Sequence, residues 1–167
     1  WIDRIVGYEG FRHSGFFAPW RCWPPRLPRM IDKRIESIDR ALDGIVDGAS
    51  VMISGFGGAG LPVNLIRALE ATSATNLTLL LNSLRFIEAY APSLFAERRV
   101  ARVICTAARG RGREPSLYER QIQDGSLALE LVPQGTFAER LRAGGAGIAA
   151  FYTPTGVGTT LIKGKEV

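Results

Sequence analysis

The stretch Asp47-Gly-Ala-Ser-Val-Met-Ile-Ser-Gly-Phe-Gly-Gly-Ala-Gly-Leu-Pro62 decides the fold of this chain. It begins with an Asp-Gly turn signal, continues as a short buried strand over Val51, Met52 and Ile53, and then runs directly into glycines. Pro62 stands where the first turn of a helix tolerates proline. The sequence therefore predicts a strand, a tight glycine loop and a helix in direct succession.

The same alternation of strand and helix continues downstream. Further apolar runs of strand length occupy residues 77–81, 100–105, 127–132 and 148–152. Helical patterns occupy residues 35–45, 62–69, 85–99 with a break at Pro92, 115–125 and 136–145. The last of these helices begins with Thr136-Phe-Ala-Glu139, which has the capping-box pattern.

Strands that are continuous apolar runs indicate a mostly parallel sheet that is covered by helices on both faces. With right-handed crossovers, the expected fold is an open three-layer α/β/α domain. Ligands of such sheets bind beyond the carboxyl ends of the strands. We therefore expect the site in the loops that follow four strand ends: Ile53, Leu81, Cys105 and Val132.

Residues 1–29 do not fit this pattern. They contain all three tryptophans of the chain and no helical or strand period. A secretory signal is excluded because Arg12, His13 and Ser14 interrupt any apolar middle segment. Met30 has the features of a natural start. We therefore expect residues 1–29 to be a poorly ordered or non-native leader outside the fold, and residues 30–167 to form one domain.

Composition and charge exclude several classes of function. Five arginines against Asp3 and Glu9 in residues 1–29 supply three of the net +5 charges, and the remaining +2 is too little for a nucleic-acid-binding domain. No apolar run approaches the ~20 residues that span a bilayer, so we expect a soluble cytoplasmic protein with no membrane partner. The only histidine, His13, lies in the leader, which excludes a histidine triad or a histidine-rich metal site from the domain. Cys105 ends a strand pattern and is expected to be a buried, inert thiol.

The segment Gly55-Phe-Gly-Gly-Ala-Gly60 matches the dinucleotide fingerprint G-x-G-x-x-G after a strand and before a helix. That fingerprint also needs an acidic residue about 20 positions later to bind the ribose. Asn82 and Ser83 occupy that place, and Pro62 is unusual for the fingerprint. A Rossmann-like redox or regulatory domain is therefore the alternative rather than the leading hypothesis.

The longer stretch from Asp47 to Pro62 resembles the signature of family I coenzyme A transferases. That signature has an acidic or amide residue and glycine, two free positions, three apolar residues, G-G-F, three free positions and G-x-P. Only Ser54 departs from it, because the family usually has the first glycine there. A second block begins at Leu131-Val-Pro-Gln-Gly-Thr136 and includes Phe151-Tyr-Thr-Pro-Thr-Gly-Val-Gly-Thr159. It is similar to the alpha subunits of 3-oxoadipate and acetoacetate coenzyme A transferases.

The resemblance covers Met30 to Val167 and implies a fold of the CoA-transferase and ribose-5-phosphate isomerase type. It also implies that coenzyme A moves from a donor such as succinyl-CoA to a 3-oxoacid. In the family a glutamate of the beta subunit is the nucleophile, and a glutamyl-CoA thioester gives ping-pong kinetics. The expected partner is thus a beta subunit in an alpha–beta or alpha2–beta2 assembly. The coenzyme A thioester is a substrate, and no tightly bound cofactor or metal is expected. Relative to the usual alpha subunit, we interpret the chain as truncated at its C-terminal end.

The resemblance also assigns candidate site residues. Gln134, from the Pro-Gln-Gly-Thr motif, is the candidate catalytic residue. The candidate coenzyme A and substrate-binding residues are Ser54, Gly55, Phe56, Gly57, Gly58, Ala59, Gly60 and Asn82. After the second strand the family commonly has a Ser-Asn-Asn-Ala-like stretch, and this chain keeps only Asn82 of it.

Each assignment has a simpler alternative. The glycine loop is otherwise a tight turn that serves packing alone, and Gln134 a turn residue bonded to local backbone. Arg109, Arg111 and Arg113 either meet coenzyme phosphates or form a solvated loop. No nucleophile is assigned, since solvated faces explain five glutamates: Glu88, Glu97, Glu114, Glu119 and Glu139. A non-functional remnant of a transferase is the third hypothesis.

Overall fold

The computed structural model describes residues 34–164, so the leader predicted at residues 1–29 lies outside the described residues. A compact unit begins at Ile35 and contains a four-stranded sheet. Its strands are β1 (Ser50–Ile53), β2 (Leu77–Ser83), β3 (Val100–Ala107) and β4 (Ala128–Leu131). Their order in the sheet follows their order in the chain, and all three pairings are parallel. The α/β class and the parallel sheet predicted from the sequence are confirmed.

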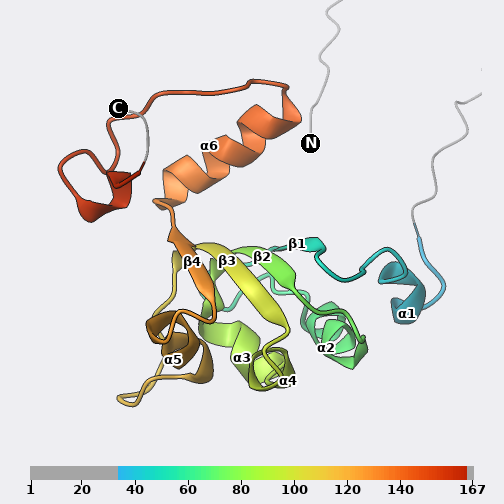
Figure 1. The fold of residues 1–167 in the computed structure, drawn as a ribbon. Coiled ribbons are helices and arrows are strands. Elements are labelled where there is room, and N and C mark those ends of the chain that lie inside the picture. Colours follow the sequence, from blue (N-terminus) through green and yellow to red (C-terminus); the bar gives the residue numbers. More distant parts are fainter. Residues whose placement is uncertain (1–33, 165–167) are drawn as a thin grey trace, which may run out of the picture. The chain divides into compact units, whose positions relative to one another are not determined.

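Helices lie before, between and after the strands. They are α1 (Ile38–Ala41), α2 (Val63–Ala71), the 3-10 turn η1 (Leu84–Phe86), α3 (Ile87–Tyr90), α4 (Ser93–Ala96), α5 (Leu117–Gln123), α6 (Gln134–Gly145) and the 3-10 turn η2 (Thr160–Ile162). Figure 1 shows α2, α3, α4 and α5 together on one side of the sheet. Right-handed crossovers between strands in sequential order return on the same side, which explains this arrangement.

Burial alternates along the strands because successive side chains point to opposite faces. Leu77, Leu79 and Leu81 of β2 are at most 2% exposed and face the helices. The helices supply the other half of the core: Ile66, Leu69, Ile87, Leu94, Phe95 and Tyr118. On the opposite face Met52 is 57% exposed. The described helices between the strands thus cover one face of the sheet.

The end of α2 is held by a buried arginine. The guanidinium of Arg99, the residue just before β3, donates to the carbonyl oxygens of Ala74 at 2.9 Å and Glu70 at 2.7 Å. It also donates to the carbonyl of Leu69 at 3.3 Å and to Thr72 Oγ1 at 3.0 Å. The last carbonyls of a helix have no partner within the helix, and a cation there also complements the helix dipole. Arg99 therefore ties the end of α2 to the sheet.

Three local predictions are wrong. Residues 35–45 form only the four-residue helix α1, since Ile35 and Ile38 are exposed instead of lining a buried stripe. Residues 148–152 form no strand, because no described strand lies beside them to pair with. Helix α6 begins at Gln134, so Thr136 lies inside it with a buried hydroxyl that has no described partner and cannot act as its cap.

The capping box occurs in α5 instead. The Ser116 hydroxyl accepts from the Glu119 amide, and the Glu119 carboxylate accepts from the Ser116 amide. The expectation for Cys105 is confirmed: its thiol is fully buried, and this burial raises its pKa to about 11. Among the helices that the structure describes, none has both the length and the apolar character needed to cross a membrane.

Candidate active site

The glycine loop after β1, residues 54–60, is a closed and largely exposed turn. The amide of Phe56 donates to the carbonyl of Ala59, and the amide of Ala59 donates back to the carbonyl of Phe56, each at 2.9 Å. The hydroxyl of Ser54 donates to the carbonyl of Gly60 at 3.1 Å and closes the base of the loop. Ser54, which stands in place of the family's usual glycine, thus stabilises the loop from within.

Two positions in this loop require glycine. At Gly55, φ is +120°, and a Cβ atom there would lie 2.7 Å from Cδ2 of Leu61. At Gly58, φ is +93°, and a Cβ atom would lie 3.1 Å from Cζ of Phe86. Such φ angles are unfavourable for residues with side chains. The two glycines therefore allow the loop backbone to approach the side chains of Leu61 and Phe86 closely.

The loop presents free backbone donors to solvent. Within residues 34–164, the amides of Gly57 and Gly58 donate no hydrogen bond, and both residues are exposed. Successive unpaired amides in a turn form a concave site that favours anionic or partially negative oxygen. The loop can therefore bind a carbonyl, carboxylate or phosphate oxygen.

Asn82 lies beside the base of this loop. The register pairs Ile53 with Leu81, so Ser54 and Asn82 follow at the carboxyl ends of neighbouring strands. The Asn82 carbonyl accepts from Thr106 Oγ1 at 2.8 Å, which joins β2 to β3 at this edge. Its half-buried side-chain amide forms no hydrogen bond with any described residue, so it can bind a ligand.

Gln134 stands at the other end of the same sheet edge. It is the first residue of α6, is exposed, and its side-chain amide makes no hydrogen bond with described residues. The alternative in which it bonds local backbone is therefore not observed. Since β4 is three strands from β1, Gln134 and the glycine loop are separated by about 14 Å of sheet width. The structure brings Ser54 and Asn82 together but does not bring Gln134 to them.

Phe86, which was not predicted, lies against the glycine loop, and its ring carries Arg111, which was expected either to meet coenzyme phosphates or to lie in a solvated loop. The ring of Phe86, in η1, touches Gly58 with its tip. The guanidinium carbon of Arg111 lies 4.5 Å from the centroid of the same ring. These residues come from the loops that follow β2 and β3, and no spacing in the sequence relates positions so far apart. The arginine-glycine repeat of residues 109–113 is the only signal that the sequence carries.

The carboxylate of Glu119 organises the loop that carries Arg111. It accepts from the Ser116 amide at 2.9 Å and hydroxyl at 2.8 Å, and from Arg109 Nη1 at 2.7 Å. The hydrogen bond from the Ser116 amide, followed by those from Arg109, the Ser116 hydroxyl and the Gly110 amide, lowers its pKa to about 2. Its side chain is only 12% exposed, so a solvated face is the wrong description of Glu119.

Of the other four glutamates predicted on solvated faces, three form contacts with described residues. Glu88 accepts from the amide of Leu117 at 3.0 Å and is therefore engaged in joining α3 to α5. Glu139 pairs with Arg142 at 2.6 Å rather than capping a helix, and the hydrogen bond from Arg142 lowers the pKa of Glu139. Glu97 is 63% exposed and lies 3.9 Å from Arg99. None of these three carboxylates contacts the glycine loop, so none is assigned as its nucleophile.

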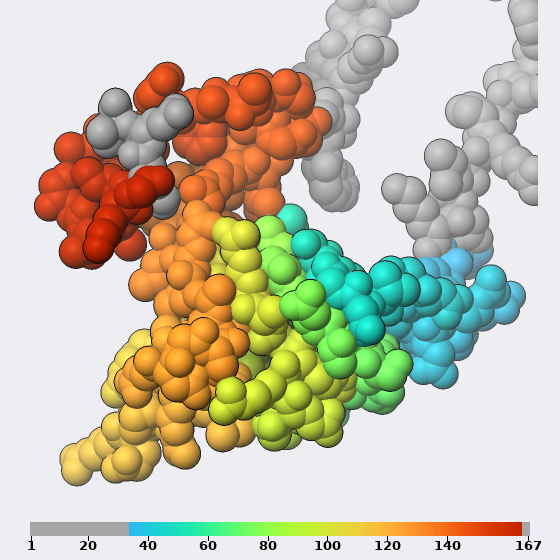
Figure 2. Space-filling view, in the orientation of Figure 1, coloured from blue at the N-terminus to red at the C-terminus, as the bar shows by residue number. Residues whose placement is uncertain are grey.

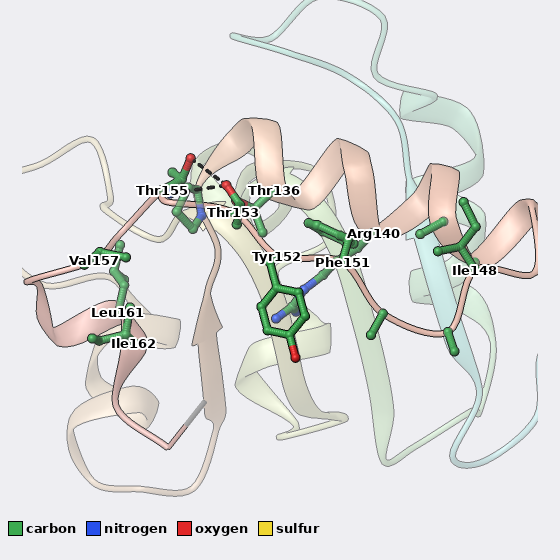
Figure 3. A pocket seen from close by; sticks show the side chains of 15 residues that line it. Thr136, Arg140, Ile148, Phe151, Tyr152, Thr153, Thr155, Val157, Leu161 and Ile162 are labelled. Carbon is green, nitrogen blue, oxygen red and sulfur yellow. Dashed lines mark hydrogen bonds between the residues drawn. The ribbon is translucent and has the colours of Figure 1, made fainter. Parts of the chain in front are cut away.

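A large hollow of about 730 Å³ lies between α6 and the segment that follows it. Figure 2 shows this segment in red beside the orange helix, and Figure 3 shows Arg140 of α6 beside Phe151 and Tyr152. The hollow is lined mainly by apolar side chains and borders Pro133, next to Gln134. It contains neither the glycine loop nor Asn82, so the predicted site is an exposed edge and not this hollow.

Comparison with known proteins identifies relatives of this chain. The family model described as coenzyme A transferase matches residues 35–167. The A-subunit of the 3-oxoadipate CoA-transferase of Pseudomonas putida is 42% identical over 82% of this chain and 58% of its own length. The A-subunit of the succinyl-CoA:3-ketoacid coenzyme A transferase of Xanthomonas campestris pv. campestris (strain B100) is 44% identical, over 80% of this chain and 54% of that protein.

Longer relatives and a solved structure agree with these matches. The mitochondrial succinyl-CoA:3-ketoacid coenzyme A transferase 2 of Homo sapiens is 44% identical over 86% of this chain and 27% of that protein. A crystal structure of a variant of the decarboxylase AibA/AibB has a TM-score of 0.64 and 25% identity, over 76% of this chain and 49% of that one. The chain thus spans little more than half of the two bacterial relatives and about a quarter of the mitochondrial enzyme.

Proposed function

Since the chain belongs to the coenzyme A transferase family, we propose that it forms part of the alpha subunit of a 3-oxoacid coenzyme A transferase. The observation that carries the proposal is the exposed glycine loop with the free amides of Gly57 and Gly58. The family match disfavours the dinucleotide-binding alternative, which rests on the glycines alone. The buried, unpaired Cys105 suits the reducing cytosol that we propose as its location.

The proposed reaction moves coenzyme A from succinyl-CoA to 3-oxoadipate or acetoacetate in two half-reactions. A glutamate carboxylate attacks the acyl thioester, which gives an acyl-glutamyl anhydride and the thiolate of coenzyme A. The thiolate then attacks the glutamyl carbonyl, releases the acyl group as a carboxylate and leaves a glutamyl-CoA thioester. The 3-oxoacid carboxylate reverses these steps and leaves with the coenzyme.

This chain contributes positioning and charge stabilisation in the proposal. Each attack converts a carbonyl oxygen into an oxyanion, and the amides of Gly57 and Gly58 are the donors that we assign to it. A donor of this kind typically contributes ~10²–10³ in rate. The free side-chain amide of Asn82 holds the substrate beside the loop. Gln134, at the other end of the sheet edge, is assigned to donate to the reacting carboxylate only where the assembled site brings that carboxylate to it.

The glutamate itself comes from a beta subunit in this proposal. Among the described residues, Glu88 and Glu119, which come after the loops that follow β2 and β3, already accept hydrogen bonds from backbone amides. An exposed loop with donors and without a nucleophile requires a partner to complete it. We therefore propose an alpha–beta or alpha2–beta2 assembly.

Co-expression of the chain with a beta subunit of this family tests the proposal. The complex should transfer coenzyme A from succinyl-CoA to acetoacetate or 3-oxoadipate, with the parallel double-reciprocal lines of a ping-pong enzyme. NADH at the concentration used for succinyl-CoA should not inhibit this transfer. A chain that forms a complex but transfers coenzyme A to neither acceptor, or that forms no complex, would support the remnant hypothesis.

A further inference from the structure

The ring of Phe86 links the glycine loop to a cation. Its tip lies against Gly58, where an added Cβ atom would be 3.1 Å from Cζ. Its face carries the guanidinium of Arg111, at 4.5 Å from the ring centroid. A guanidinium stacked on an aromatic face is attracted by the ring and loses part of its freedom. Arg111 is therefore held one aromatic ring away from the loop amides.

The charge of Arg111 is free to meet a ligand, unlike that of its neighbour. Arg109 forms an ion pair with Glu119 at 2.7 Å. Arg111 is exposed and forms no ion pair with any carboxylate of residues 34–164. Its planar guanidinium can donate two parallel hydrogen bonds to a carboxylate, which form a bidentate pair. The carboxylate of Glu119 fixes the loop that carries Arg111 through its hydrogen bonds to Arg109 and Ser116. Stacking on Phe86 keeps the guanidinium near the glycine loop.

The position of Arg111 indicates which part of a coenzyme A thioester it can reach. A thioester carbonyl on the amides of Gly57 and Gly58 has its acyl chain on one side and the pantetheine arm on the other. The phosphates lie at the far end of that long arm. The distal carboxylate of a dicarboxylic acyl group lies only a few bonds from the carbonyl. A cation one ring away from Gly58 is therefore placed for the distal carboxylate.

We infer that Arg111 is a specificity-determining residue that binds the distal carboxylate of a dicarboxylic acyl group whose reacting end lies on the glycine loop. The inference rests on the proposed function and adds the substrate class. Phe86 is the positioning residue that holds the guanidinium. The complex therefore prefers 3-oxoadipate, which has this second carboxylate, to acetoacetate, which ends in a methyl group.

The test compares kcat/KM for the two acceptors in the complex of the full chain with its beta subunit. Each half-reaction of a ping-pong enzyme reports its own substrate, so kcat/KM for the acceptor is independent of the donor. Arg111→Met should lower kcat/KM for 3-oxoadipate by about 10- to 100-fold, the usual effect of losing a hydrogen bond to a charged group. The value for acetoacetate should change by less than about 2-fold.

Two further variants separate charge from structure. Arg113→Met removes an equal charge from the same loop and should leave the ratio of the two kcat/KM values unchanged. Phe86→Leu keeps Arg111 but removes its stacking, and should lower the ratio less than Arg111→Met does. Thermal unfolding of each complex shows whether the fold is intact.

Each outcome either supports or overturns the assignment of Arg111 to the distal carboxylate. A loss confined to 3-oxoadipate supports the inference. Equal losses for both acceptors, no loss for either, or a wild-type complex active on acetoacetate alone would overturn it and leave the transferase function standing. A loss of Arg111 sensitivity when dephospho-coenzyme A replaces coenzyme A would assign the cation to a phosphate and overturn the carboxylate assignment. A wild-type complex that uses neither acceptor would refute the proposed function and this inference together.

Discussion

At the residue scale, Gly58 is the position where loop shape and neighbouring packing meet. Its φ of +93° and its contact with the Phe86 ring both oppose a side chain. We expect Gly58→Ala to lower the free energy of unfolding by about 2 kcal/mol, in the range for a residue forced into such a conformation. Because the ring must move, transferase activity of the complex should fall as well. Urea unfolding monitored by circular dichroism measures the first effect.

Gly57 provides the matched control. It also has a positive φ, +58°, but an added Cβ atom would meet nothing within 4 Å. Gly57→Ala should therefore cost only the conformational penalty, about 1 kcal/mol. Equal losses in the two variants would show that the Phe86 ring gives way freely and does not constrain the loop.

Glu119 predicts a pH dependence of stability. Its hydrogen bonds lower its pKa in the folded chain to about 2, from an ordinary value of 4.5. The stabilisation is therefore complete above pH 4.5 and is lost as the pH falls from 4.5 toward 2. Glu119→Gln should lower the free energy of unfolding at pH 7 by about 1–2 kcal/mol, the range for losing a helix cap. Urea titrations at pH 7 and pH 2.5 should show this difference shrinking at the lower pH.

Glu139→Gln is the control, since Glu139 is on the surface and pairs only with Arg142 among the described residues. Its effect at pH 7 should be much smaller than that of Glu119→Gln. A difference between wild type and Glu119→Gln that stays constant from pH 7 to pH 2.5 would contradict the assignment of Glu119 as an ionised cap.

Among site residues, the sequence predicted those that depend on local spacing. Glycines between a strand and a helix indicate their loop directly, and Asn82 follows from its place at a strand end. The contact between Phe86 and Arg111 could not be predicted, because it requires the loops after β2 and β3 to meet. The role of Glu119 was missed for a different reason. Ser116 and Glu119 share the capping-box spacing with Thr136 and Glu139, and spacing alone does not show which pair begins a helix.

At the element scale, the attachment of α2 to the sheet depends on Arg99. The side chain is 6% exposed and donates to three carbonyl oxygens and one hydroxyl. We expect Arg99→Met to lower the free energy of unfolding by about 3 kcal/mol, because buried carbonyls lose their partner. Chemical denaturation of the chain measures this loss. Arg99→Lys should recover part of it.

Arg98→Met controls for the loss of a cation at this place. Arg98 is adjacent in the sequence, its side chain is 63% exposed, and it forms an ion pair with Asp124 at 3.5 Å. Exposed pairs contribute little, so the variant should lose less than about 1 kcal/mol. Similar losses of unfolding free energy in both variants would show that the hydrogen bonds of Arg99 to the end of α2 add no stability beyond that of an exposed ion pair.

Elements that pair with neighbours in the chain were predictable, and those that depend on their surroundings were not. Residues 77–81 and 100–105 are apolar runs that found parallel partners and became β2 and β3. Residues 148–152 have the same kind of pattern but follow α6 into the wall of the hollow, where Tyr152 is 86% exposed. Apolar composition alone cannot distinguish a strand from an extended segment, because a strand is defined by its partner.

At the scale of the whole unit, the rate at which the Cys105 thiol reacts measures how often the whole fold opens. It lies in β3 between two other strands, is fully buried, and its burial raises its pKa to about 11. Thiolate is the reactive form, so a disulfide reagent should label native Cys105 only through unfolding. In a Cys22→Ser background, the labelling rate near neutral pH should rise with urea in step with global unfolding. Fast labelling without urea would contradict the buried position of β3.

The sequential strand order has a consequence for synthesis of the chain. Each of β2, β3 and β4 pairs with the strand made just before it, so no strand has to wait for a later segment to find its neighbour. Nearby pairings of this kind close short loops and favour rapid folding. As the polypeptide emerges from the ribosome, the sheet can therefore grow at one border while its earlier part is already shielded by helices.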